Sequence, residues 1–101
     1  MAALTWTHQA LEDLEAICLY IARDAPMMAR VVADRVFRAS AQLAEFPQLG
    51  RVVPEIGRPD IREVLVHNYR IIYRYRVEDS QVVVLTVHHG ARILRGLPTV
   101  G

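Results

Sequence analysis

The 101-residue sequence contains no lysine, and all 12 of its basic side chains are arginine. It has one cysteine, Cys18, which cannot form an internal disulfide and is typical of a reducing compartment. Its longest apolar runs, such as residues 82–87, fall far short of the roughly 18 residues that span a bilayer. The first residues also lack the basic start and apolar segment of a signal peptide. These absences predict a soluble, cytoplasmic protein with no disulfide framework.

The composition is that of a compact globular protein. Hydrophobic residues make up 52% of the chain and charged residues only 23%, which excludes a disordered polypeptide. A chain of this length supports one hydrophobic core but not two. We therefore expect a single domain over residues 1–101, with no internal repeat and no separate regulatory module.

The charges are distributed unevenly along the chain. The net charge is +1, but the first 50 residues sum to −2 and the remainder to +3. An anionic partner is therefore expected to meet the second half. Arginine pairs bidentately with carboxylate or phosphate, although an arginine-only composition also arises in a GC-rich genome. The choice of arginine thus identifies no partner by itself.

Apolar residues in the first half recur at spacings of three and four, which predicts two amphipathic helices. The first is expected to begin near Thr7, a suitable N-cap, and to end before Pro26. The second is expected to run from about Pro26 to Phe46. So short a connection predicts an antiparallel helical hairpin, whose apolar seam must be covered by the rest of the chain.

The second half alternates in the manner of β-strands. Strands are predicted over residues 61–67, 69–77 and 81–88, joined by tight turns into an antiparallel meander. A short strand at residues 2–6 is expected to join the sheet edge, and a further helical turn is possible at residues 91–97. The predicted fold class is α+β, in the order βααβββ.

The predicted middle strand has two contrasting faces, because successive side chains of a strand point to opposite sides. Tyrosines and aliphatic residues occupy the odd positions and are expected to pack on the helices. Arginines dominate the even positions, and helices on only one side would leave that face open to solvent or a partner. The odd positions are Tyr69, Ile71, Tyr73, Tyr75 and Val77, and the even ones Arg70, Ile72, Arg74 and Arg76.

Several short motifs occur in a recognisable order. They are Trp6, the stretch Asp13-Leu14-Glu15-Ala16-Ile17, Gly50-Arg51-Val52-Val53-Pro54-Glu55, Ile61-Arg62-Glu63-Val64, Tyr69-Arg70-Ile71-Ile72-Tyr73 and Val87-His88-His89-Gly90-Ala91-Arg92. With the βααβββ order, this chain resembles the RelE/ParE superfamily of bacterial type II toxins over residues 2 to about 95. The resemblance implies a toxin that is neutralised by a cognate antitoxin wrapped around it, in a stable hetero-oligomer.

The resemblance implies two alternative targets, because RelE-like proteins cleave mRNA in the ribosomal A site and ParE-like proteins inhibit DNA gyrase. A net charge of +1 is weak for binding within ribosomal RNA, and the chain lacks the lysine-rich site of one RelE branch. These features favour a ParE-like gyrase inhibitor. A ribosome-dependent endoribonuclease is the alternative, and a non-toxic, antitoxin-binding family member is the third.

For the nuclease alternative, the resemblance assigns catalytic residues by motif position. Glu55 would be the base, Arg70 would clamp the phosphate and His89 would be the acid. Adjacent histidines point to opposite faces of a regular strand, and the alternation places His88, rather than His89, on the arginine face. Both histidines therefore stay candidates.

Purely structural roles compete with these assignments. Glu55 follows a proline in a loop and could cap a turn or pair with Arg51. Arg70 could form a cross-strand pair with a carboxylate such as Glu63. Neither alternative needs a substrate.

Four further arginines are candidates for antitoxin contacts, target contacts or a solvated face. Antitoxin contacts are favoured, because antitoxin tails are commonly acidic and arginine binds carboxylates bidentately. No metal site is expected, since the four histidines have no spacing that converges with Cys18, and no cofactor motif is present. The four arginines are Arg62, Arg74, Arg76 and Arg92.

Overall fold

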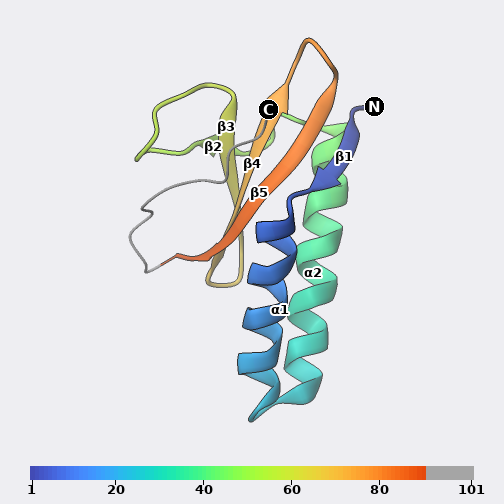
Figure 1. Ribbon diagram of the computed structural model, residues 1–101, viewed down its shortest axis with the longest axis vertical. Coiled ribbons are helices and arrows are strands. Elements are labelled where there is room, and N and C mark those ends of the chain that lie inside the picture. The colour runs from blue at the N-terminus through green and yellow to red at the C-terminus, as the bar shows by residue number, and fades with distance from the viewer. Residues whose placement is uncertain (91–101) are drawn as a thin grey trace.

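The computed structural model describes residues 1–90 and consists of a helical hairpin packed on a five-stranded sheet (Figure 1). The strand order is β1-β5-β4-β3-β2, with β1 parallel to β5 and the other pairs antiparallel. The elements are β1 (Ala3–Trp6), α1 (His8–Ala22), α2 (Pro26–Glu45), β2 (Arg51–Val52), β3 (Ile61–Val66), β4 (Tyr69–Arg76) and β5 (Gln81–His89).

The predicted α+β class and element order are confirmed, with one strand added. That strand, β2, has only two residues, too few for an alternating pattern to be recognised. The short N-terminal strand lies at the sheet edge, as expected. The helical turn expected at residues 91–97 lies outside the described residues.

The helical hairpin is fixed to the sheet at its N-terminal end. The Oγ1 of Thr7 accepts a hydrogen bond from the Ala10 amide at 3.0 Å and so caps α1. The same hydroxyl donates to the carbonyl of Leu85 in β5 at 2.7 Å. Pro26 opens α2 after a connection of three residues, so the two helices are antiparallel. Their far end extends well beyond the sheet (Figure 1).

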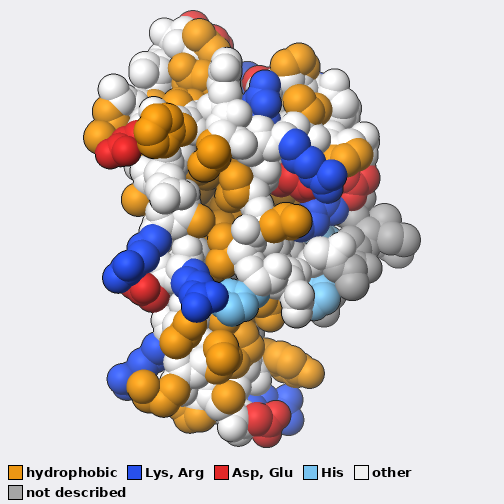
Figure 2. Space-filling view, turned by 180° about the vertical axis from the view of Figure 1, so that it is seen from behind, with side chains coloured by type: hydrophobic (Ala, Val, Ile, Leu, Met, Phe, Trp, Pro, Cys, Tyr) orange, Lys and Arg blue, Asp and Glu red, His pale blue; other side chains and the backbone are white. Residues whose placement is uncertain are grey.

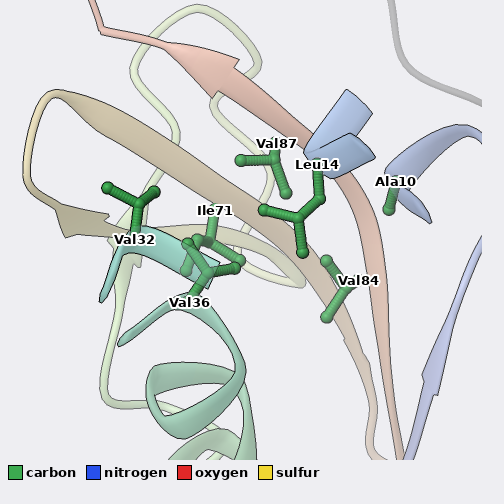
Figure 3. Packing of buried hydrophobic residues seen from close by; sticks show 7 residues of the cluster. All are labelled: Ala10, Leu14, Val32, Val36, Ile71, Val84 and Val87. Atoms are coloured by element: carbon green, nitrogen blue, oxygen red, sulfur yellow. The ribbon is translucent and has the colours of Figure 1, made fainter. Parts of the chain in front are cut away.

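The main core lies between the hairpin and one sheet face. Figure 3 shows aliphatic side chains of both helices directed at those of β4 and β5. The tyrosine face of β4 packs on this side, as predicted: Tyr73 is fully buried, and Tyr69 and Tyr75 are partly buried. The prediction is wrong for Val77, which follows the end of β4 and is 64% exposed. The cluster comprises Ala10, Leu14, Val32, Val36, Ile71, Val84 and Val87.

The hydroxyl of Tyr73 holds the segment that follows α2 against this face. It donates to the carbonyl of Pro47 at 2.7 Å and accepts from the amide of Gly50 at 2.9 Å. Gly50 approaches β3 so closely that a Cβ atom there would lie 2.5 Å from the carbonyl oxygen of Glu63. Only glycine can occupy this position without a shift of the backbone.

The expectation that the arginine face is open is wrong. The segment between β2 and β3 folds over that face and encloses a second, smaller core. The cause is visible in the alternation itself, because Ile72 lies among the arginines and faces the same way as two side chains of β5. Covering these apolar groups removes them from water. The second core comprises Val53, Ile61, Ile72, Val83 and Leu85, with Ile56 packed against it.

The alternation of β5 is interrupted by a bulge. Tyr73 lies opposite Val84 and Ile72 lies opposite Thr86, which leaves Leu85 without a partner across the strands. Leu85 consequently packs in the second core, while Val87 packs in the first. A regular strand would place these two side chains on one face, and the bulge places them on opposite faces.

We expect Tyr73→Phe to lower the free energy of unfolding by about 1–3 kcal/mol, because the buried Gly50 amide loses its acceptor. Urea denaturation measures this change. Tyr75→Phe is the control, since the Tyr75 hydroxyl makes no hydrogen bond within residues 1–90, and it should change stability by no more than about 0.5 kcal/mol. Equal losses in the two variants would contradict the anchoring function of the Tyr73 hydroxyl.

Candidate functional site

Glu55 and Arg70, the two residues assigned to base and phosphate clamp, meet directly. Arg70 lies on β4 and Glu55 lies in the segment before β3. The Nη1 and Nη2 atoms of Arg70 donate to the two carboxylate oxygens of Glu55, each at 2.7 Å. This fork-to-fork pairing is the strongest that arginine makes with a carboxylate. The alternative pairing of Glu55 with Arg51 is not the one observed.

Glu63 of β3 binds Arg70 as well, and it also binds Arg51. Its Oε1 accepts from Arg70 Nε at 2.6 Å, and its Oε2 accepts from Arg51 Nε at 2.6 Å. The predicted cross-strand pair of Arg70 with Glu63 is thereby confirmed. The Glu63 and Arg70 side chains are only 1% and 8% exposed. We call these four residues, Glu55, Arg70, Glu63 and Arg51, the charge network; acidic and basic side chains gather on the sheet part of the molecule in Figure 2.

The charge network shifts the titration of its members. The hydrogen bonds from Arg70 hold the pKa of Glu55 at about 2, well below the usual range of a glutamate. The pKa of Arg70 is raised, chiefly by its hydrogen bonds to Glu55. At neutral pH both side chains are fully charged. A carboxylate with so low a pKa is a poor general base, because efficient bases titrate near the working pH.

A cavity of about 440 Å³ opens beside the charge network. Of the two adjacent histidines, His89 lines this cavity and His88 does not. The ring of His89 contacts Tyr69 edge to face at a centroid distance of 5.5 Å. The cavity is lined by Arg51, Glu55, Leu65, His67, Asn68, Arg70, His89 and Gly90.

His88 lies opposite Arg70 in the strand register but lines a different cavity, of about 630 Å³, with Asp13 and Tyr20 of α1. Its Nε2 atom is buried and has no hydrogen-bond partner within residues 1–90. The strand register therefore agrees with the alternation that placed His88 on the arginine side, whereas the cavity beside Arg70 is lined by His89. The two histidines end β5, and His89 lines both cavities.

The remaining arginines of the sheet are held by local partners. Arg62 donates to the carbonyls of Pro59 and Gly50, each at 3.0 Å. These bonds fasten the segment that covers the second core. Arg74 donates to Asp60 at 2.9 Å, and Arg76 pairs with Asp79 at 2.7 Å. Arg92 lies outside the described residues. Antitoxin contacts through these arginines stay a prediction.

Sequence reasoning treated Glu63 only as a partner and missed its central position. Its place in the strand could have revealed it, because Glu63 shares the face of Ile61 and is therefore directed inward. Asp13 was also missed. Its carboxylate accepts hydrogen bonds from the Thr86 hydroxyl and from the Val87 amide, and it thereby ties α1 to β5 beside the bulge.

Residues 1–90 show neither a metal-binding cluster nor a membrane-spanning helix. Within that range, no group of three or more His, Cys, Asp or Glu side chains could hold a metal ion. Cys18 is half-buried on α1, and burial raises the pKa of its thiol, which disfavours the reactive thiolate. No helix in the same range is long and apolar enough to cross a membrane.

The chain is similar to known toxins in sequence. The family model described as the ParE toxin of the type II toxin-antitoxin system parDE matches residues 4–94. Toxin RelE2 of Caulobacter vibrioides is 38% identical over 93 residues, which cover 92% of this chain and 100% of the relative. The putative toxin Y4kP of Sinorhizobium fredii is 37% identical over 87 residues, or 85% of each chain.

Solved structures share the fold at lower identity. The chromosomal ParDE system of P. aeruginosa contains a chain with a TM-score of 0.72 and 20% identity, matched over 88% of this chain and 96% of that one. A chain of the intact E. coli RelBE toxin-antitoxin complex matches with a TM-score of 0.63 and 19% identity, over 91% of this chain and 100% of that one. At such identities the likeness shows the architecture alone.

Lowering the pH should reveal how much the ionised Glu55 side chain contributes to the free energy of unfolding. Its pKa is about 2 in the folded protein and about 4.3 in an unfolded chain, so the ionised side chain stabilises the fold above pH 4.3. That stabilisation is lost as the pH falls through 2. We expect Glu55→Gln to be less stable than the parent at pH 6 and equally stable near pH 2, as measured by urea denaturation across this range.

Glu78→Gln serves as the matched control, because Glu78 is exposed in the turn between β4 and β5, outside the charge network. It should follow the parent protein at every pH. A constant difference between Glu55→Gln and the parent down to pH 2 would show that the loss comes from packing and not from the charge of Glu55.

Proposed function

Because this chain belongs to the ParE toxin family of type II toxin-antitoxin systems, we propose that it arrests growth by inhibiting DNA gyrase through a protein surface, without cutting nucleic acid. Toxins of the wider RelE/ParE superfamily share one fold, so architecture does not select the target. The choice therefore depends on the chemistry that the charge network permits.

The occupied guanidinium of Arg70 is the observation that carries this proposal. Cleavage of RNA without a metal needs a base for the 2′-hydroxyl and a cation that faces the phosphate. Arg70 is instead directed at two carboxylates, with a side chain only 8% exposed. Glu55 is held as a strongly acidic carboxylate with a pKa of about 2. The charge network thus supports a structural function for both residues.

A RelE-like endoribonuclease is the second candidate, and one observation favours it. His89 lines the same cavity as Glu55 and Arg70, so the three motif residues do converge on one surface. Arg51, which also lines the cavity and pairs with Glu63, has a side chain that is 65% exposed. In this alternative, substrate binding would have to draw Arg70 away from its carboxylates.

We propose that this chain binds an antitoxin, whether its target is gyrase or the ribosome. Large apolar side chains are exposed near the end of the helical hairpin, with Leu19 at 64%, Tyr20 at 71% and Met27 at 69%. Exposed apolar groups gathered on one part of a small protein indicate a surface that a partner covers. A hetero-oligomer is accordingly the expected stable form.

Induction of this chain alone in a bacterial host tests the target. We expect loss of DNA supercoiling within the first minutes while bulk translation continues, because gyrase would be inhibited directly. Plasmid topoisomers and amino-acid incorporation are followed in parallel. Early translational arrest with ribosome-phased mRNA cuts would favour the nuclease instead, and unchanged growth would indicate a member of the family that has lost toxicity.

Substitution of His88 and His89 distinguishes gyrase inhibition from RNA cleavage. As a gyrase inhibitor, the protein should keep its toxicity in His88→Ala and in His89→Ala, since neither ring is needed for proton transfer. A nuclease that used one of them as its acid would lose about 100-fold or more in cleavage while still binding antitoxin. Growth arrest and antitoxin co-purification are the two measurements.

A further inference from the structure

We infer that two copies of this chain associate through the outer face of the helical hairpin, the face turned away from the sheet, and form a four-helix bundle. The inference concerns the isolated chain and goes beyond the proposed function, because it depends on neither the target nor the antitoxin. Figure 1 shows α1 and α2 side by side, with the sheet against one side of the pair. The other side is free to pack against a second polypeptide.

One row of exposed side chains follows each helix on this outer face. Residues three or four positions apart lie on the same face of an α-helix. All members of the two rows are exposed, whereas residues that face the sheet, such as Leu14 and Val36, are buried. We call the two rows together the outer stripe. It comprises Leu11, Glu15 and Leu19 of α1 and Met27, Arg30, Asp34 and Phe37 of α2.

Two layers of the outer stripe are apolar. The thiol of Cys18 lies 3.8 Å from the carbonyl oxygen of Ala29, which fixes how the antiparallel helices lie against each other. Large apolar side chains are consequently level with one another at each end of the stripe. Each of these layers would leave water if it packed against an apolar layer of a partner. The layers are Leu11 with Phe37, each 48% exposed, and Leu19 with Met27, 64% and 69% exposed.

The layer between them is charged and contains unpaired groups. Glu15 is level with the turn of α2 that lies between Arg30 and Asp34. Asp34 pairs with Arg38 at 3.0 Å. The side chains of Glu15 and Arg30 form no hydrogen bond or ion pair within residues 1–90. Each of these two groups can therefore accept a partner of opposite charge.

The layers match a second copy of this chain, related by a two-fold axis parallel to the helices. Such an axis places α1 of one copy against α2 of the other at the same level. Apolar layers then meet apolar layers, and Glu15 of each copy faces Arg30 of the other, so that the interface contains this ion pair twice. Adjacent helices are all antiparallel, as in an up-and-down four-helix bundle.

The charges disfavour the other symmetric arrangement. A two-fold axis perpendicular to the helices would match the apolar layers only by placing α1 on α1, with Glu15 opposite Glu15 of the second copy. Two carboxylates held face to face repel each other. The Asp34 side chains, which would then face Arg30, are already paired with Arg38.

A second copy fits the outer stripe better than an acidic antitoxin segment does. An acidic segment would meet the carboxylates of Glu15 and Asp34, whereas a second copy presents both signs of charge in the matching order. Tyr20 does not belong to the stripe. It lines the cavity beside β5 and stays available to an antitoxin.

The outer face is small, so the association should be weak. The 15 residues of α1 extend over about 22 Å, and two adjacent helices are about 20 Å wide. A face of this size buries about 900 Å² over both copies, less than the roughly 1,200 Å² of stable complexes. We therefore expect a dimer that dissociates on dilution.

Sedimentation velocity of the isolated chain across the micromolar range tests the association. We expect the monomer to convert to a dimer as the concentration rises. Leu19→Gln should raise the dissociation constant of the dimer about tenfold, because a polar group enters an apolar layer. Leu65→Gln is the matched control, since Leu65 is equally exposed, at 65%, but lies on β3, and it should leave the constant unchanged.

Exchange of the charges tests the pairing of Glu15 with Arg30. Glu15→Arg and Arg30→Glu should each raise the dissociation constant about tenfold, because each places like charges opposite one another. The double variant restores opposite charges across the interface and should dimerise about as well as the parent. Glu78→Arg, in the turn between β4 and β5, is the control and should have no effect. Thermal unfolding of each variant verifies that it folds.

A chain that stays monomeric at every concentration would overturn the inference and leave the proposed function intact. A dimer that is unaffected by Leu19→Gln and by the charge variants would also overturn it, because that dimer would use another surface. Tighter association of Glu15→Gln would overturn the arrangement of the helices, since it would show that the two Glu15 side chains face each other. None of these results changes the outcome of the induction experiment on gyrase and translation.

Discussion

The buried carboxylate of Glu63, held between the guanidinium groups of Arg70 and Arg51, constrains the whole sheet side of the molecule. A charge that is 1% exposed is tolerated only when it is paired, so these groups must stay together for the protein to stay folded. The pairing ties β4 to β3 and β3 to β2. Through Glu55 it also fixes the segment that covers the second core.

This constraint changes how the motif residues are interpreted. Residues that a nuclease would need to keep free for substrate are engaged with one another, and the resulting low pKa of Glu55 is a property of a structural pair. Exposed apolar side chains lie elsewhere, at the end of the hairpin. A toxin that acts by binding another protein is consistent with this division of the molecule.

Much of the fold followed from short-range patterns. Thr7 and Pro26 marked the helix boundaries, and the alternation of β4 identified its helix-facing side. The failures have specific physical causes. The two-residue β2 is too short to carry a periodic signal, and the bulge at Leu85 reverses the alternation of β5 without a glycine or proline to mark it.

The sequence by itself determined the α+β order, the helical hairpin, the helix-facing side of the sheet and the set of residues from which a site could be built. These properties depend on neighbours within a few positions along the chain. Only the tertiary structure decided that Glu55 binds Arg70 and not Arg51, and that His89 lines the cavity beside them. Those contacts depend on how the second core draws the segment before β3 over the sheet, which is a packing of residues distant in sequence.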